Sequence, residues 1–105
     1  MYQLVEQEYI CQNPVLLIFF NRIDTTEITL KAIAKVKPPR IYLACDGGRD
    51  EEEVQKVQSV REKVLSLIDW QCDVFTRFLD KNVGCKLGVS SAITWFFDNE
   101  GGGNP

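Results

Sequence analysis

Apolar and polar positions follow one another along the chain in blocks that predict three strands and three helices in alternation. Near-continuous apolar runs over 15–21 and 40–46 are typical of strands buried on both faces. Over 25–36, 51–68 and 84–98 the apolar residues instead recur at spacings of three and four, which predicts helices. A third strand is expected over 72–79, where the mixture of apolar and polar residues suits an edge strand with one wetter face.

Capping and breaking signals suggest where the helices begin and end. Asp24 followed by Glu27 has the spacing of a capping box, and the prolines of 37–39 end the first helix. The acidic run 50–53 suits the start of the second helix, because the helix dipole favours negative charge there; metal binding is the alternative for this run. Asn82 is a candidate cap for the third helix. The helical side chains expected to face inward include Ile28, Leu30, Ile33, Val36, Val54, Val57, Val60, Val64, Leu87, Val89, Ile93, Phe96 and Phe97.

This alternation predicts a single α/β domain with a parallel sheet, right-handed crossovers and the strand order three-two-one. With helices on both faces, it is a three-layer α/β/α domain. We expect residues 13–100 to form the domain, residues 1–12 to be an N-terminal extension, and residues 101–105 to be a flexible tail.

Composition narrows the classes of function. The 105 residues carry a formal net charge of −3, which argues against nucleic acid or an anionic membrane surface as a partner. No stretch approaches the roughly 18 apolar residues of a membrane span, and the N-terminus lacks signal-peptide features, so a cytoplasmic protein is expected. Histidine is absent, which removes the commonest general base. The four cysteines show no C-x-x-C spacing and are interpreted as structural, as are Trp70 and Trp95.

Two polar turns follow the first two predicted strands. Asn21, Arg22 and Asp24 come directly after the first strand, and Asp46 to Asp50 follow the second. In open α/β sheets, ligands bind outside the carboxyl ends of the strands. The two turns therefore mark one candidate binding site at neighbouring strand ends.

Three motifs, in this order, resemble the N-terminal half of a bacterial glycosyltransferase with the GT-A fold. They are FFNRxDTT over 19–26, AxDGxRD over 44–50, and KNxGCK over 81–86 followed by SSAI over 90–93. The likeness is to the HlpA-like group of nucleotide-diphospho-sugar transferases and covers about residues 13–100. The resemblance implies a Rossmann-like βαβαβα half that binds the nucleotide of an activated sugar.

By resemblance, Asn21, Arg22 and Asp24 would lie against base, ribose or phosphate, and Asp46 would accept a hydrogen bond from the base, such as the N–H of uracil. Structural alternatives exist for Asp24, as a helix cap, and for Arg22, as a surface ion pair. The resemblance implies a weakly bound uridine nucleotide or nucleotide sugar as the ligand. The full set of implied nucleotide-binding residues is Asn21, Arg22, Asp24, Asp46, Gly47, Arg49, Gly84 and Lys86.

The remaining implied roles follow from charge and backbone access. Gly47 would let the backbone approach the ligand closely. Arg49 and Lys86 would meet the diphosphate, and Gly84 would open the third helix toward it.

The sequence also departs from the family. Ile23 and Gly48 stand where proline is usual, and Glu100 is followed by three glycines where the family has an acidic motif that holds Mg²⁺ or Mn²⁺. No metal ligand, cofactor or catalytic residue is therefore expected in this chain, and the chain alone is expected to be inactive.

Two other classes of function remain open from the sequence. One is a non-enzymatic interaction module that self-associates, as a homodimer paired through the edge of the strand over 15–21. The other is a small nucleotide-binding regulator.

Overall fold

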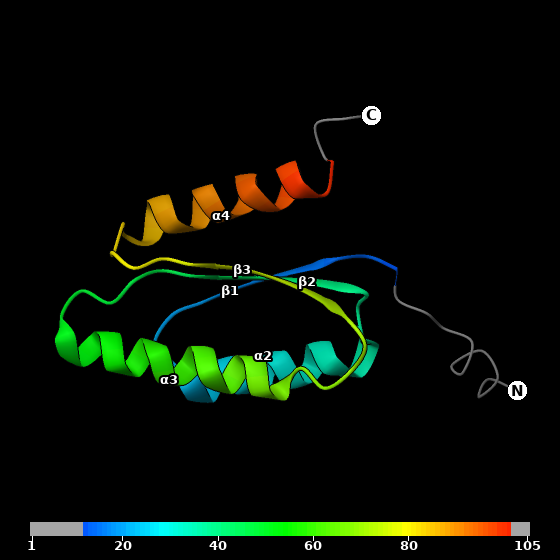
Figure 1. The fold of residues 1–105 in the computed structure, drawn as a ribbon, viewed down its shortest axis with the longest axis horizontal. Coiled ribbons are helices and arrows are strands. Elements are labelled where there is room, and N and C mark those ends of the chain that lie inside the picture. Colours follow the sequence, from blue (N-terminus) through cyan, green and yellow to red (C-terminus); the bar gives the residue numbers. More distant parts are fainter. Residues whose placement is uncertain (1–11, 102–105) are drawn as a thin grey trace, which may run out of the picture.

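The computed structural model describes residues 12–101, in which three strands alternate with three helices (Figure 1). Both strand pairings are parallel, and the order in the sheet is β1-β2-β3. The predicted α/β class, element order and strand order are confirmed. The expected tail lies outside the described residues from 102 onward, and so does the expected extension up to residue 11. The elements are β1 (Val15–Phe19), α2 (Ile23–Val36), β2 (Arg40–Cys45), α3 (Glu51–Leu67), β3 (Asp73–Phe78) and α4 (Cys85–Asn99).

The sheet separates two unequal helical layers. Helices α2 and α3 lie together on one face, and α4 lies alone on the other (Figure 1). Side chains alternate between the two faces along each strand. In β2, Leu43 therefore belongs to the α2–α3 face, while Tyr42 belongs to the α4 face, where its ring meets Trp95 and Phe96 edge-on.

The α2–α3 face holds the hydrophobic core, and we call it the closed face. Trp70 packs against this core and donates its Nε1 hydrogen to the carbonyl oxygen of Pro38 at 2.9 Å. Burial of each large apolar side chain contributes about 1.5–3 kcal/mol. The nine buried residues of the core are Leu17, Phe19, Leu30, Ile41, Leu43, Cys45, Val57, Val60 and Val64.

The α4 face, which we call the open face, carries a cluster of polar contacts at the C-terminal end of α4. Arg40 donates two hydrogen bonds to Glu100, at 2.8 and 2.9 Å, and the Tyr42 hydroxyl donates a third at 2.6 Å. The Tyr42 ring also stacks on Phe75, with centroids 4.7 Å apart. The contacts of Glu100 fasten the end of α4 to the start of β2.

Several helical side chains that were expected to face inward are exposed. Ile28 is 70% exposed, because the buried face of α2 runs through Thr26 and Leu30 and the helical repeat places Ile28 opposite it. On the open face, α4 has no neighbouring helix, so its flanks face solvent. The corrections are Ile28, Val36, Val54, Leu87, Ile93 and Phe97.

Both expected caps are wrong. Helix α2 begins one residue before Asp24, whose Oδ1 accepts the adjacent Thr25 N–H at 2.8 Å instead of capping the helix. Gly84, not Asn82, is the N-cap of α4, and its φ of 94° is a conformation that side chains rarely adopt. Asp50, which was expected only to place negative charge at the start of α3, is its N-cap and accepts the Glu53 N–H at 2.8 Å.

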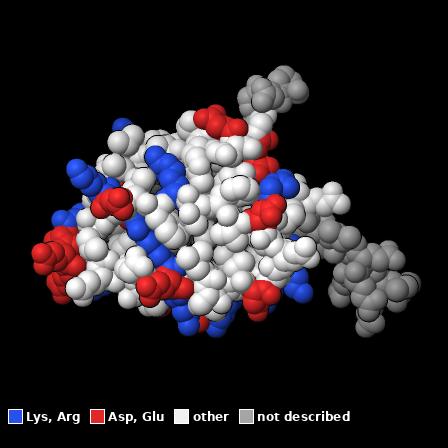
Figure 2. All heavy atoms as spheres, in the orientation of Figure 1, with Lys and Arg blue, Asp and Glu red and all other residues white. Residues whose placement is uncertain are grey.

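The surface charge is mixed, with one local concentration. Acidic side chains gather at the end of the molecule where α3 begins (Figure 2), as expected from the exposed Glu51 and Glu52 in its first turn. Within residues 12–101, no helix combines the length and apolar character needed to cross a membrane.

Candidate functional site

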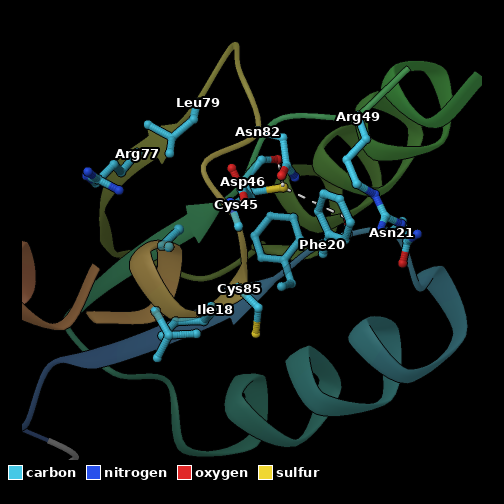
Figure 3. Close-up of a pocket in the computed structure, with 15 residues that line it drawn as sticks. Ile18, Phe20, Asn21, Cys45, Asp46, Arg49, Arg77, Leu79, Asn82 and Cys85 are labelled. Atoms are coloured by element: carbon cyan, nitrogen blue, oxygen red, sulfur yellow. Dashed lines mark hydrogen bonds between the residues drawn. The ribbon is translucent and has the colours of Figure 1, made fainter. Parts of the chain in front are cut away.

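A cavity of about 350 Å³ opens at the carboxyl ends of the strands (Figure 3). Its floor includes Ile18, Ala44 and Arg77, which are register partners across the three strands and belong to the open face. The first turns of α4 line it on the other side with Cys85 and Gly88. Ala44 and Gly88 carry little or no side chain, which leaves the space between helix and sheet unfilled. The predicted location of the site, at the strand ends, contains this cavity.

Another part of the cavity is lined by Phe20, Asn21 and Arg49. The side chains of Asn21 and Arg49 are held by Glu53, which was not predicted to belong to the site. The Arg49 guanidinium lies 5.8 Å from the centre of the Phe20 ring. Glu53, only 8% exposed, accepts from Arg49 Nε and Nη2, both at 2.7 Å, and from Asn21 Nδ2 at 3.0 Å. Glu53 therefore fixes both side chains relative to each other.

The electrostatics of Glu53 follow from these bonds. The hydrogen bonds from the Arg49 side chain, and then the one from the Arg49 backbone N–H at 2.9 Å, lower the pKa of Glu53 to about 2. The signal that indicates this residue is the Asp50–Glu53 spacing, which matches a capping box. Here the Glu53 carboxylate reaches the N–H one residue before the cap.

Asp46 fastens the loop before α4 to the end of β2. Its Oδ1 accepts the N–H groups of Gly47 at 2.8 Å and Val83 at 2.9 Å, and its Oδ2 accepts that of Gly84 at 3.0 Å. A carboxylate offers about four acceptor sites. One site on Oδ2 therefore remains for a ligand, so Asp46 combines a structural contact with the capacity to bind.

Four of the eight predicted site residues line the cavity, namely Asn21, Asp46, Arg49 and Gly84. Arg22 and Asp24 are exposed outside this lining and face each other at 3.5 Å, as in the surface ion pair considered for Arg22. Lys86 lines a separate hollow beside the first turn of α4.

Gly47 is also absent from the cavity lining. A Cβ on it would lie 2.7 Å from the carbonyl carbon of Lys81, so glycine is required by the close approach of the chain over 80–82. Asn82 Nδ2 donates to the Gly47 carbonyl oxygen at 2.8 Å and holds this approach.

Arg61 is a second residue that the sequence analysis left out. Its Nη2 donates to the carbonyl oxygens of Asp46 at 3.0 Å and Leu79 at 2.8 Å, and its guanidinium lies 4.9 Å from the Phe78 ring centre. It joins the carboxyl ends of β2 and β3 behind the cavity. The sequence feature that indicates Arg61 is its position four residues after Val57, which places it on the inner face of α3.

Arg77 is the third such residue. It is half-buried in β3 and lies across the cavity from Asn21 and Arg49 (Figure 3). Arg77 makes no ion pair with any residue of the described range 12–101. It can therefore offer its positive charge to a bound anion.

The thiols divide into structural and accessible groups. Cys45 is buried in the core, where desolvation raises the pKa of its thiol. Cys85 is exposed and lines the cavity, so the structural interpretation does not extend to it. Cys72 is half-buried just before β3, and Cys11 lies outside the described residues.

No protein-family model, curated protein or solved structure matches this chain.

Proposed function

We propose that this chain is a nucleotide-binding α/β domain of the Rossmann-like kind that forms the N-terminal half of GT-A glycosyltransferases. Its ligand would be a nucleoside diphosphate or nucleotide sugar, with uridine as the favoured nucleoside. The observation that carries the proposal is the cavity at the strand ends, which combines an aromatic ring, two guanidinium groups and a carboxylate. The proposal assigns binding, and no transfer reaction, to these residues.

The base is the part of the nucleotide that suits the apolar lining. A flat ring can lie against Phe20 and the small side chain of Ala44. The remaining acceptor site on Asp46 Oδ2 can take a ring N–H, and uracil offers one.

The phosphates would meet guanidinium groups. Glu53 occupies Nε and one Nη2 hydrogen of Arg49, so three of its five N–H donors remain. Arg77, on the opposite side of the cavity from Arg49 (Figure 3), adds a positive charge there that no described carboxylate neutralises. In the proposal, Arg77 takes the role that was expected of Lys86, because Lys86 lines a different hollow.

Titration of the ¹⁵N-labelled chain with UDP tests the proposal. We expect weak binding near millimolar, equivalent to about 4 kcal/mol, with shifted amides in 18–21, 44–49 and 82–89. Mg²⁺ should change the affinity little, because the proposal includes no metal site. Shifts confined to other parts of the chain would contradict the site, and sugar transfer from UDP-glucose by the chain alone would contradict the absence of a reaction.

Alkylation of the thiols supplies a second readout. UDP should slow the reaction of Cys85 with iodoacetamide, because Cys85 lines the cavity. Cys72 is the internal control, since it precedes β3 at the opposite end of the strand from the cavity. Equal protection of both thiols would indicate a general change in stability instead of a ligand at the site.

Self-association through β1 is the second candidate function, and the open edge of β1 favours it. β1 pairs only with β2 in the described sheet, its five residues are all apolar, and Ile18 is 39% exposed. Edge strands that avoid pairing usually carry lysine or proline, and β1 has neither. We propose that the occupant is a second copy, paired antiparallel about a two-fold axis to give a six-stranded sheet.

Light scattering over a dilution series tests this pairing. We expect the apparent mass to rise toward that of a dimer with concentration. A semisynthetic chain with one outward amide of β1 N-methylated should stay nearer the monomer mass, since it lacks one pairing donor. A monomer mass at every concentration would contradict the dimer.

A further inference from the structure

Gly88 occupies a position where neither the backbone nor the packing requires glycine. It lies in the interior of α4, where glycine destabilises a helix relative to alanine. A Cβ built on Gly88 would meet its nearest neighbour, Asp46 Oδ2, at 3.6 Å, which is ordinary van der Waals contact. At Gly47 and Gly48, in contrast, a Cβ would lie 2.7 and 2.5 Å from backbone atoms. The two turn glycines are therefore explained by their surroundings, and Gly88 is not.

The missing side chain has a definite effect on the cavity. Gly88 lines the cavity, and the atom that its Cβ would face is the carboxylate oxygen of Asp46 that keeps an unused acceptor site. Ala44 lines the same space from the sheet. Glycine at this position therefore leaves unfilled the part of the cavity beside Asp46 Oδ2, between α4 and the sheet.

We infer that Gly88 determines which ligands reach Asp46, by admitting the edge of a flat ring that carries an N–H donor. This inference rests on the proposed function for the class of ligand, and it adds the route and the specificity. The ring would lie between the first turns of α4 and the row formed by Ile18 and Ala44, with its N–H directed at Asp46 Oδ2. A methyl group at position 88 would occupy part of that space.

The substitution Gly88→Ala distinguishes this role from a structural one. A structural requirement for glycine predicts a lower Tm in the variant, whereas the proposed role predicts a higher Tm. The added methyl group should raise Tm by about 4 °C through helix propensity. The same group should weaken the binding of UDP and uridine at least tenfold. Ser90→Ala is the matched control: Ser90 is exposed on α4 and does not line the cavity, so this variant should raise Tm slightly and leave binding unchanged.

The binding of three probes is measured by NMR titration of the wild-type chain and both variants. Uridine carries the ring N–H, 3-methyluridine lacks it, and UDP adds the diphosphate. The inference expects uridine to bind wild-type protein more tightly than 3-methyluridine, with that preference lost in Gly88→Ala.

Equal binding of UDP by wild type and Gly88→Ala would overturn the inference and leave the proposed function in place. Uridine binding that depends on Gly88 but gains nothing from the diphosphate would overturn the proposed nucleotide function and keep the inference about the ring. Binding of none of the three probes by the wild-type chain would overturn both.

Discussion

The two faces of the sheet are built in different ways. The closed face is a continuous apolar core between β1–β3 and the helix pair α2–α3, and Leu43 at its centre is 0% exposed. The open face has one helix, whose C-terminal end is held by Arg40, Tyr42 and Glu100 while its N-terminal end borders the cavity. The difference indicates a division of labour, in which the closed face supplies stability and the open face leaves room for a ligand.

The largest effect is expected from damage to the closed face. Leu43→Ala should lower the free energy of unfolding by about 3 kcal/mol, because the deletion removes buried apolar atoms and leaves a cavity. Urea denaturation followed by circular dichroism measures it. Ile28→Ala is the control, since Ile28 is largely exposed on α2 and its change should stay within about 0.5 kcal/mol. Equal losses in the two variants would show that the closed face has been misidentified.

A smaller loss is expected when the fastening at the end of α4 is broken. Glu100→Gln removes the charge that accepts bonds from Arg40 and Tyr42, and should cost about 1.5 kcal/mol. The hydrogen bond from Arg40 lowers the pKa of Glu100 below its usual value of 4.5. The stabilisation is therefore present above pH 4.5 and is lost as the pH falls through the lowered value.

Urea denaturation at pH 7 and pH 3 measures this dependence. The wild type should lose more stability between the two pH values than Glu100→Gln does. Tyr42→Phe, which removes only the hydroxyl, should show an intermediate loss at pH 7. A Glu100→Gln variant as stable as the wild type at pH 7 would mean that the bonds to Glu100 do not contribute to holding α4.

A still smaller effect is expected at the N-terminal end of the same helix. Asp46→Asn keeps one acceptor oxygen but loses one of the bonds to the loop before α4, which should cost about 1 kcal/mol, as for the loss of a helix cap. Hydrogen exchange should become faster at the amides of Val83 and Gly84, and UDP binding should weaken. Unchanged exchange at these amides would contradict the structural role, and unchanged binding would contradict the role toward the ligand.

The contrast between the faces also explains what the sequence could predict. The strands and helices were predictable because Leu43, Val57 and Val60 belong to regular apolar repeats that a core imposes. The hydrogen bonds between Arg40 and Glu100 were not predictable, because they join residues 60 positions apart along the chain. The exposure of Phe97 was missed for a related reason, since an apolar stripe does not reveal that a neighbouring helix is absent from that face.

The candidate site was predictable to a similar extent. Its location follows from topology, because parallel strands end at the same edge of a sheet. Its side chains do not follow from motif positions alone. Arg77 belongs to a strand and reaches the cavity through its register with Ala44. Glu53 does not line the cavity, but a capping interaction turns its carboxylate back toward Arg49, which does. Register and capping geometry are settled by the folded chain.

The last prediction concerns Glu53, which belongs to α3 but fixes the side chains of the site. Its pKa of about 2, against the usual 4.5, means that the bonds to Arg49 and Asn21 are stabilising above pH 4.5 and are lost only as the pH falls toward 2. Carbon-13 NMR should find the Glu53 carboxyl still ionised at pH 3, well below the usual glutamate value of 4.5. Glu53→Gln should leave the fold intact and broaden the Arg49 side-chain resonances, because the guanidinium loses its charged acceptor. A Glu53 titration at the usual value of 4.5 would show that the carboxylate does not hold Arg49, and the site would then lack the fixed geometry that distinguishes it from the rest of the open face.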